Sequence, residues 1–164
     1  MKTIVSVLTA AAILGGASYV RAQDASHLIQ TPAEAMWGQA PPMLPAGAQI
    51  AVLSGDPTKA APYTVRLKFP ANYAIPAHSH PTDENVVVVS GSLTFGMGDR
   101  LSKTAEGNKT IGAGGYALAP ASMNHYAYAG ASETTIVLFG VGPVEFKYVN
   151  AADDPRNAKT GAKK

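Results

Sequence analysis

The fold is decided by the stretch PAHSHPTDENVVVVSG, residues 76–91. Side chains alternate between the two faces of an extended strand, so His78 and His80 are predicted to point the same way. Pro81 has no N–H to donate to a sheet ladder, so one strand should end there and the next should begin at Glu84. Two imidazoles and a carboxylate are therefore expected at one corner of a two-stranded unit, as a set typical of transition-metal ligands.

The valine run gives a separate reason for a metal. Glu84 and the valines two and four residues later share one face, and the intervening valines share the other, so this strand is predicted to be central and buried on both faces. A buried carboxylate without a partner would be costly, and a metal ion is a natural partner. A third imidazole would complete a four-ligand site, and His125 is the clear candidate.

These residues resemble the first motif of the cupin superfamily. That motif reads glycine, five residues, H-x-H, three or four residues, glutamate, six residues and glycine. His78, His80, Glu84 and Gly91 match it with every interval correct. The leading glycine falls on Asn72, a departure, but asparagine also tolerates left-handed backbone angles.

The second cupin motif resembles residues 114–129. Gly114, Pro120 and His125 match its glycine, proline and histidine at the right spacing. Ser122 replaces a glycine of the motif and Ala129 replaces an asparagine, both at positions that vary in the family. The 22 residues of 92–113 separate the two motifs, as is usual in the family. No tandem copy is present, which indicates a single cupin domain.

The resemblance implies an all-β fold with one cupin (double-stranded β-helix, jelly-roll) barrel over residues 48–149. It also implies that the metal ligands are His78, His80, Glu84 and His125. Such a set suits one divalent transition metal: Fe, Mn, Ni, Cu or Zn. Two alternatives remain open. The barrel could keep its histidines as satisfied core polar groups without a metal, or His125 could be an ordinary strand histidine.

Length and composition favour one packed domain. The chain has 164 residues, 46% hydrophobic and 15% charged, and no cysteine, so disulfides and thiolate chemistry are excluded. Without Lys2 and Arg21 the 13 basic residues become 11, against 11 acidic residues. A nearly neutral chain without a basic patch does not indicate a nucleic-acid partner.

The first residues read as a signal peptide, 1–22. A positive charge at Lys2, an apolar run over 4–14 and short residues up to Ala22 predict cleavage before Gln23 and a periplasmic or secreted protein with no membrane span after cleavage. The alternative is an uncleaved membrane anchor. The apolar run is shorter than the roughly 20 residues that a spanning helix needs, which favours cleavage.

Two irregular segments flank the predicted barrel. Residues 23–47 form a proline-rich N-terminal arm, in which Trp37 is expected to pack against the barrel exterior or a neighbouring subunit, and His27 is expected at the surface. Residues 150–164 are polar and predict a flexible C-terminal tail. Cupins often pair through sheet edges, so by analogy we expect a homodimer, with the Trp37 segment in the contact.

The barrel wall would select the ligand. Residues of apolar strand faces are the candidates for a substrate pocket: Val65, Leu67, Phe95, Met97 and Phe139. A mostly apolar wall favours a small, largely apolar or aromatic ligand. The same residues could equally be barrel core.

Two classes of function follow from the motif. The first is an exported metal-dependent cupin enzyme, an oxidoreductase of the oxygenase (dioxygenase-like) type that acts on a small organic molecule at the open positions of the metal. The alternative is a metal-loaded module that binds or senses a small ligand without turnover. The sequence resembles stand-alone cupins related to the cupin domain of oxidant-responsive anti-sigma factors, which supports the second class. A structural cupin with an idle site is a third reading, because the fold alone does not fix a reaction.

Overall fold

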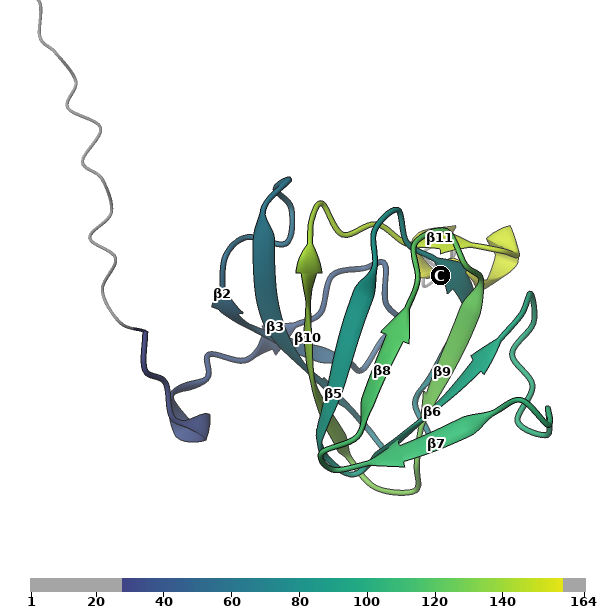
Figure 1. The fold of residues 1–164 in the computed structure, drawn as a ribbon, viewed down its shortest axis with the longest axis horizontal. Helices are drawn as coiled ribbons and strands as arrows, with labels where there is room; N and C mark the ends of the chain where they lie inside the picture. Colours follow the sequence, from purple (N-terminus) through teal and green to yellow (C-terminus); the bar gives the residue numbers. More distant parts are fainter. Residues whose placement is uncertain (1–27, 158–164) are drawn as a thin grey trace, which may run out of the picture.

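The computed structural model describes residues 28–157, so the predicted signal peptide and His27 lie outside the described part. The expected all-β fold is confirmed, with two antiparallel sheets of a jelly roll (Figure 1). The strands of the first sheet are, in spatial order, β1 (Gly38–Gln39), β2 (Gln49–Ser54), β3 (Pro62–Phe69), β10 (Thr134–Val141), β5 (Glu84–Ser90) and β8 (Tyr116–Ala119). Those of the second are β11 (Lys147–Tyr148), β4 (Ala74–Ser79), β9 (His125–Ala129), β6 (Ser92–Met97) and β7 (Lys109–Gly112).

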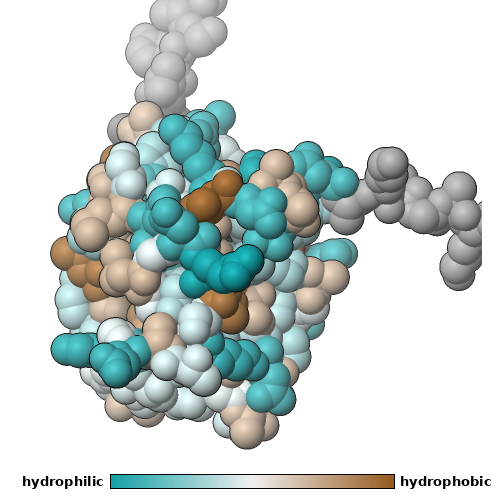
Figure 2. Space-filling view, turned by 90° about the vertical axis from the view of Figure 1, so that its right-hand side faces the viewer, coloured by the Kyte–Doolittle hydropathy of each residue, from teal (hydrophilic) through white to brown (hydrophobic). Residues whose placement is uncertain are grey.

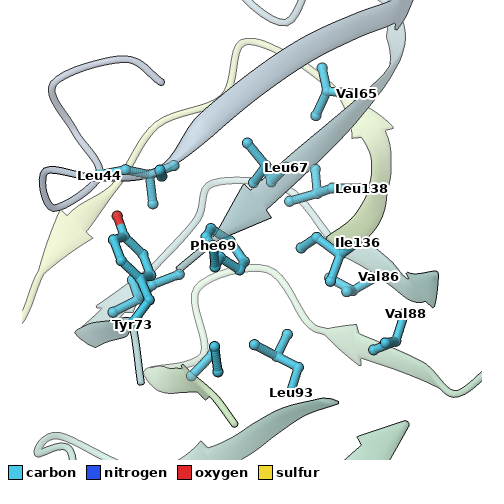
Figure 3. Close-up of a cluster of buried hydrophobic side chains, with 14 of the residues drawn as sticks. Leu44, Val65, Leu67, Phe69, Tyr73, Val86, Val88, Leu93, Ile136 and Leu138 are labelled. Atoms are coloured by element: carbon cyan, nitrogen blue, oxygen red, sulfur yellow. The ribbon is translucent and has the colours of Figure 1, made fainter. Parts of the chain in front are cut away.

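The core lies between the sheets, as strand alternation predicts. Along β3, every second side chain from Tyr63 to Phe69 is buried. Alternate residues of β5 and β10 point the same way, and Figure 3 shows these side chains meeting Leu93 of the opposite sheet. Phe69 and Tyr73 stack at the base of this cluster with ring centroids 4.9 Å apart.

The outer face of the first sheet differs from the prediction. The valine strand β5 was expected to be covered on both faces, but only its inner face is buried. Exposed apolar side chains lie instead on the outer face of the neighbouring strands β5, β8 and β10: Val89, Tyr116, Leu118, Phe139 and Val141. We call this group the outer apolar face. Because a continuous apolar run fits either a covered or an uncovered strand, the sequence could not decide between them.

The outer side of the second sheet is covered by its own loop. Tyr126 is buried there, and its hydroxyl donates to the carbonyl of Ser102 and to Oδ1 of Asn108, both in the β6–β7 connection. Figure 2 shows the side of the molecule at the right of Figure 1, which is mostly hydrophilic or weakly hydrophobic. The two sheets therefore present different outer surfaces.

Both flanking segments pack on the barrel. Trp37 lies beneath the ammonium group of Lys68, 4.4 Å from the ring centroid, so it contacts the barrel exterior as expected. Residues 150–157 of the predicted tail contain two 3-10 turns (Ala151–Asp153 and Pro155–Asn157), and 158–164 lie outside the described residues, so the flexibility of the tail stays a prediction. A third 3-10 turn (Pro32–Glu34) lies in the arm. Between residues 28 and 157, no helix is long and apolar enough to cross a membrane.

Candidate metal centre

Three histidines converge between the sheets. His78 lies in β4, His80 follows the last residue of that strand, and His125 begins β9. One ligand nitrogen from each ring lies within 4.8 Å of the other two, and all three side chains are buried. The structure therefore brings together all three histidines of the two motifs.

A register shift in β4 places His78 in this cluster. Ile75 pairs with Ala127 and faces the core, and His78 pairs with His125. Residues three apart on a regular strand face opposite sides, so without correction one of the two would point outward. The irregularity between Ile75 and His78 changes the alternation, which lets the strand contribute both an apolar core residue and a ligand to one face.

Each ring is held in one tautomer by the backbone. The Nδ1 atoms of His78, His80 and His125 lie 2.7, 2.8 and 3.0 Å from the carbonyl oxygens of Pro76, Glu145 and Met123, respectively. A carbonyl only accepts, so each Nδ1 must carry the proton and each Nε2 must present a lone pair. Backbone carbonyls that fix imidazoles in this way are typical of the surroundings of metal ligands.

Two of the three buried lone pairs have no hydrogen-bond partner within the described part of the chain. Burial lowers the pKa of all three imidazoles, that of His78 to about 2, so the rings are neutral. Among the described residues, the buried Nε2 atoms of His80 and His125 have no hydrogen-bond partner. Satisfied core histidines would not leave such atoms unpaired, because burying a bare acceptor is costly. The residues present therefore fit a bound transition-metal cation.

Glu84 borders the histidine group without belonging to it. Its Oε1 atom lies 3.3 Å from Nε2 of His80, and burial raises its pKa to about 7, partly offset by His125. The group of mutually close donor atoms contains the three histidines alone. The structure therefore places Glu84 beside the site predicted for it, and its role as fourth ligand stays a prediction.

A segment that the sequence did not single out covers the centre. Phe146 stacks on His78 with centroids 4.5 Å apart and meets His80 edge-on at 4.5 Å. The preceding residue, Glu145, supplies the carbonyl that holds His80. Apolar and polar side chains alternate in residues 144–148, but nothing in that pattern indicates contact with histidines more than 60 residues earlier.

The structure places the five residues of the predicted pocket wall in three different environments. Val65, Leu67 and Phe95 line cavities inside the barrel. Met97 pairs with His125 at the end of β6, but it is 51% exposed and stands at the rim. Phe139 is wrong, because it lies on the outer apolar face and its neighbour Leu138 points inward.

Tyr63 is a site residue that the sequence reasoning missed. Tyr63, Gly140 and Glu84 form a row across β3, β10 and β5. Gly140 has no side chain, so the ring of Tyr63 lies over it. The Tyr63 hydroxyl is 3.5 Å from the position that a Cβ of Gly140 would take. Burial, and then the charge of Glu84, raise the pKa of this hydroxyl. The signal was available, since Tyr63 shares a face with Val65 and Leu67.

Acid is expected to destabilise the metal-free protein. Below pH 6.5 the unfolded chain binds protons at three histidines whose pKa is lowered in the folded state, and between pH 4.5 and 7 the folded chain holds one extra proton on Glu84. The net uptake on unfolding averages about one to one and a half protons over this range, so the free energy of unfolding should fall by roughly 1–2 kcal/mol from pH 6.5 to 5.5. Urea unfolding in chelator measures this, and equal or greater stability at pH 5.5 would contradict it.

Replacing Arg156 by alanine is expected to weaken metal binding by roughly two- to five-fold, less than the loss of a direct ligand partner. Its Nη2 donates to the carbonyl of Phe146 at 2.9 Å, and Asp154 holds the guanidinium. The arginine thus positions the segment that fixes His80. Competition with a coloured chelator measures the affinity. Arg100→Ala, at an exposed loop position, is the control, and equal affinities would contradict the positioning role.

Comparisons with known proteins agree with this geometry. Residues 25–145 match the model of the ChrR cupin-like domain family. The search of curated proteins found no match.

Solved structures share the fold. A polyketide cyclase, RemF, from Streptomyces resistomycificus has a TM-score of 0.53 at 17% identity, over 66% of this chain and 75% of its own. An RmlC-like cupin from Shewanella frigidimarina has a TM-score of 0.53 at 14% identity, over 77% of this chain and 96% of its own. The DMSP lyase DddQ from Ruegeria pomeroyi has a TM-score of 0.51 at 18% identity, over 67% of this chain but only 57% of its own. At these identities the likeness supports the fold alone.

Proposed function

The chain belongs to the ChrR cupin-like family, and from this premise we propose that it is an exported, metal-dependent cupin enzyme with oxygenase-type chemistry on a small organic molecule. One observation carries the proposal: three buried imidazoles present lone pairs to one point while their Nδ1 atoms donate to backbone carbonyls. Two proteins of similar fold are named as enzymes, a polyketide cyclase and a DMSP lyase.

The side chains around the metal centre would have different roles. His78, His80 and His125 would hold the metal, with Glu84 as the fourth ligand, and a transition metal there would supply Lewis acidity or redox chemistry. Phe146 shields two of the imidazoles from water. Tyr63 would place a hydroxyl proton near Glu84, as the effect of the Glu84 charge on the pKa of Tyr63 indicates.

Metal reconstitution tests the reaction class. The mature protein is stripped with chelator, reloaded separately with Fe(II), Cu(II), Ni(II) and Zn(II), and given a panel of small organic molecules in an oxygen-electrode cell. Oxygen uptake with a redox-active metal, and none with zinc or with a His80→Ala variant, would support oxygenase-type chemistry. Uptake that is independent of the bound metal would contradict it.

The second candidate is a metal-loaded module that binds a small ligand without turnover. The observation that favours it is the cavity wall, in which Glu84 is the only acidic residue and no histidine occurs among the described lining residues. Ligand binding with no chemical change in the recovered ligand, for every metal tested, would select this function over the enzyme.

Export is part of the proposal and predicts a defined mature chain. When the full-length gene is expressed in a bacterium with a signal peptidase, the protein is expected in the periplasm or medium with Gln23 as its first residue. Intact-mass measurement and N-terminal sequencing check this. A membrane-bound protein that still begins at Met1 would instead show that the leader is an anchor.

We also propose a homodimer, supported by the outer apolar face. This surface carries five exposed apolar side chains on three neighbouring strands, more than isolated surface residues would explain. Light scattering after size-exclusion chromatography measures the oligomeric state. A monomer for the wild-type protein, or a dimer that survives Leu118→Glu, would contradict pairing through this face.

A further inference from the structure

A second feature inside the barrel is a cavity of about 80 Å³ next to the metal centre. Glu84 and Phe146 line both the cavity and the space around the histidines, so the two are adjacent. Most of the remaining wall comes from two sources, the inner face of β3 and the N-terminal arm. The arm was expected only as an irregular lead-in, and its part in this wall was not predicted.

The arm forms a fixed wall of this cavity. Met43 and Leu44 line the cavity, and Leu44 is buried beside Tyr73 and Leu67 (Figure 3). The hydroxyl of Tyr148 donates to the carbonyl of Met43 at 2.8 Å, and that of Tyr73 donates to the carbonyl of Pro45. Two tyrosines of the barrel thus hold the arm by its backbone, which leaves the side chains of the arm free to shape the cavity.

The polar groups of the wall restrict the ligand. No lysine, arginine or histidine lines the cavity within the described residues, and Glu84 is its only acidic group. An anion placed there would lose its hydration without a protein counter-charge, which is strongly unfavourable. Tyr63 supplies one hydroxyl to this wall, and a phenol hydroxyl can donate a hydrogen bond to a ligand oxygen.

Resting on the proposed function, we propose that this cavity binds a small neutral carbonyl compound beside the metal. Its hydrocarbon part lies against Met43, Leu44 and Leu67, and its carbonyl oxygen accepts a hydrogen bond from Tyr63. An apolar cavity of about 150 Å³ holds benzene, so a space of about half that size fits a chain of roughly three to five non-hydrogen atoms. The arm is then the part of the chain that sets ligand length.

Methyl-resolved NMR of the zinc-loaded protein tests the assignment with three probes. We expect 2-butanone to shift the methyl signals of Val65, Leu67 and Leu138 with a dissociation constant on the order of millimolar, as its few atoms allow. In the chelator-treated protein, where no metal charge can balance it, butanoate, of similar size but charged, should bind at least about ten-fold more weakly than 2-butanone because its charge is desolvated. Tyr63→Phe should weaken 2-butanone binding by about five-fold, the effect of one lost hydrogen bond.

An arm variant separates a ligand cavity from ordinary core. Met43→Ala is expected to lengthen the cavity and reverse the order of affinity of 2-butanone and the longer 2-hexanone. Met36→Ala, which removes an 87% exposed methionine from the same arm, should leave the order unchanged. Absence of 2-butanone binding, tighter binding of butanoate, or the same order in both methionine variants would overturn the proposal.

Zinc content of the same samples keeps the two proposals distinguishable. Protein that binds no zinc but still binds 2-butanone with the expected dependence on Tyr63 and Met43 would contradict the metal function and leave the cavity assignment standing. Protein that binds one zinc ion per chain but none of the probe compounds would contradict the cavity assignment and leave the metal function standing.

Discussion

Replacing His125 by alanine is expected to abolish the stabilisation that a transition metal gives to this protein. Zinc at about a thousand times its dissociation constant should stabilise the wild type by about 4 kcal/mol, which corresponds to a rise of roughly 10–15 °C in melting temperature. His125 supplies one of three converging lone pairs, so the variant should show almost no rise. Thermal unfolding with zinc and with chelator, for each protein, measures the difference.

The comparison of metal with chelator removes the intrinsic cost of the substitution, since His125 is also a buried core residue. Ser79→Ala is the matched control, because Ser79 lies between two of the histidines and donates no ligand atom to the group. Its melting temperature should rise with zinc as in the wild type. A His125→Ala protein that keeps the full rise would remove this residue from the site.

Replacing Gly91 by alanine is expected to lower the free energy of unfolding by about 3–4 kcal/mol, near the upper end for single substitutions. Gly91 has a φ of +74°, and a Cβ there would lie 2.5 Å from the carbonyl oxygen of Glu133 and 2.6 Å from Oγ1 of Thr134. That threonine also donates to the carbonyl of Ser92 at 2.9 Å. The added methyl group must therefore push apart the β5–β6 turn and the start of β10.

Gly114→Ala isolates the contact from the backbone strain. Gly114 has a similar φ of +82°, but nothing lies within 4 Å of its added Cβ. It should lose only the roughly 1–2 kcal/mol of a left-handed alanine. Urea unfolding of both variants in chelator makes the comparison, and equal losses would show that crowding at Gly91 does not matter.

The histidine group could be predicted because its determinants are local. Two of its members are two residues apart, and the third lies at a motif position with a fixed distance from Gly114. Strand alternation also placed Val65 and Leu67 correctly. The motif glycine at residue 91 turned out to have a physical reason of its own, a positive φ against a neighbouring strand.

The rest depended on tertiary contacts that periodicity does not encode. The irregularity of β4 between Ile75 and His78 changes which residues face inward, and no local signal marks it. Phe139 was assigned inward from an apolar run, although only register with β3 and β5 decides which alternate residues are buried. Phe146 and Met43 reach the site from distant parts of the chain.

The most direct test of the account is elemental analysis of the wild-type protein, purified without added metal and again after reloading. Three converging imidazoles that are neutral and fixed in one tautomer, two of them with a buried Nε2 that has no hydrogen-bond partner among residues 28–157, should hold about one transition-metal ion per chain. A ratio near one in the wild type, lost in the His80→Ala protein, is the predicted result. No metal in the wild-type protein even after reloading would contradict the metal centre and leave a barrel that binds only an organic ligand.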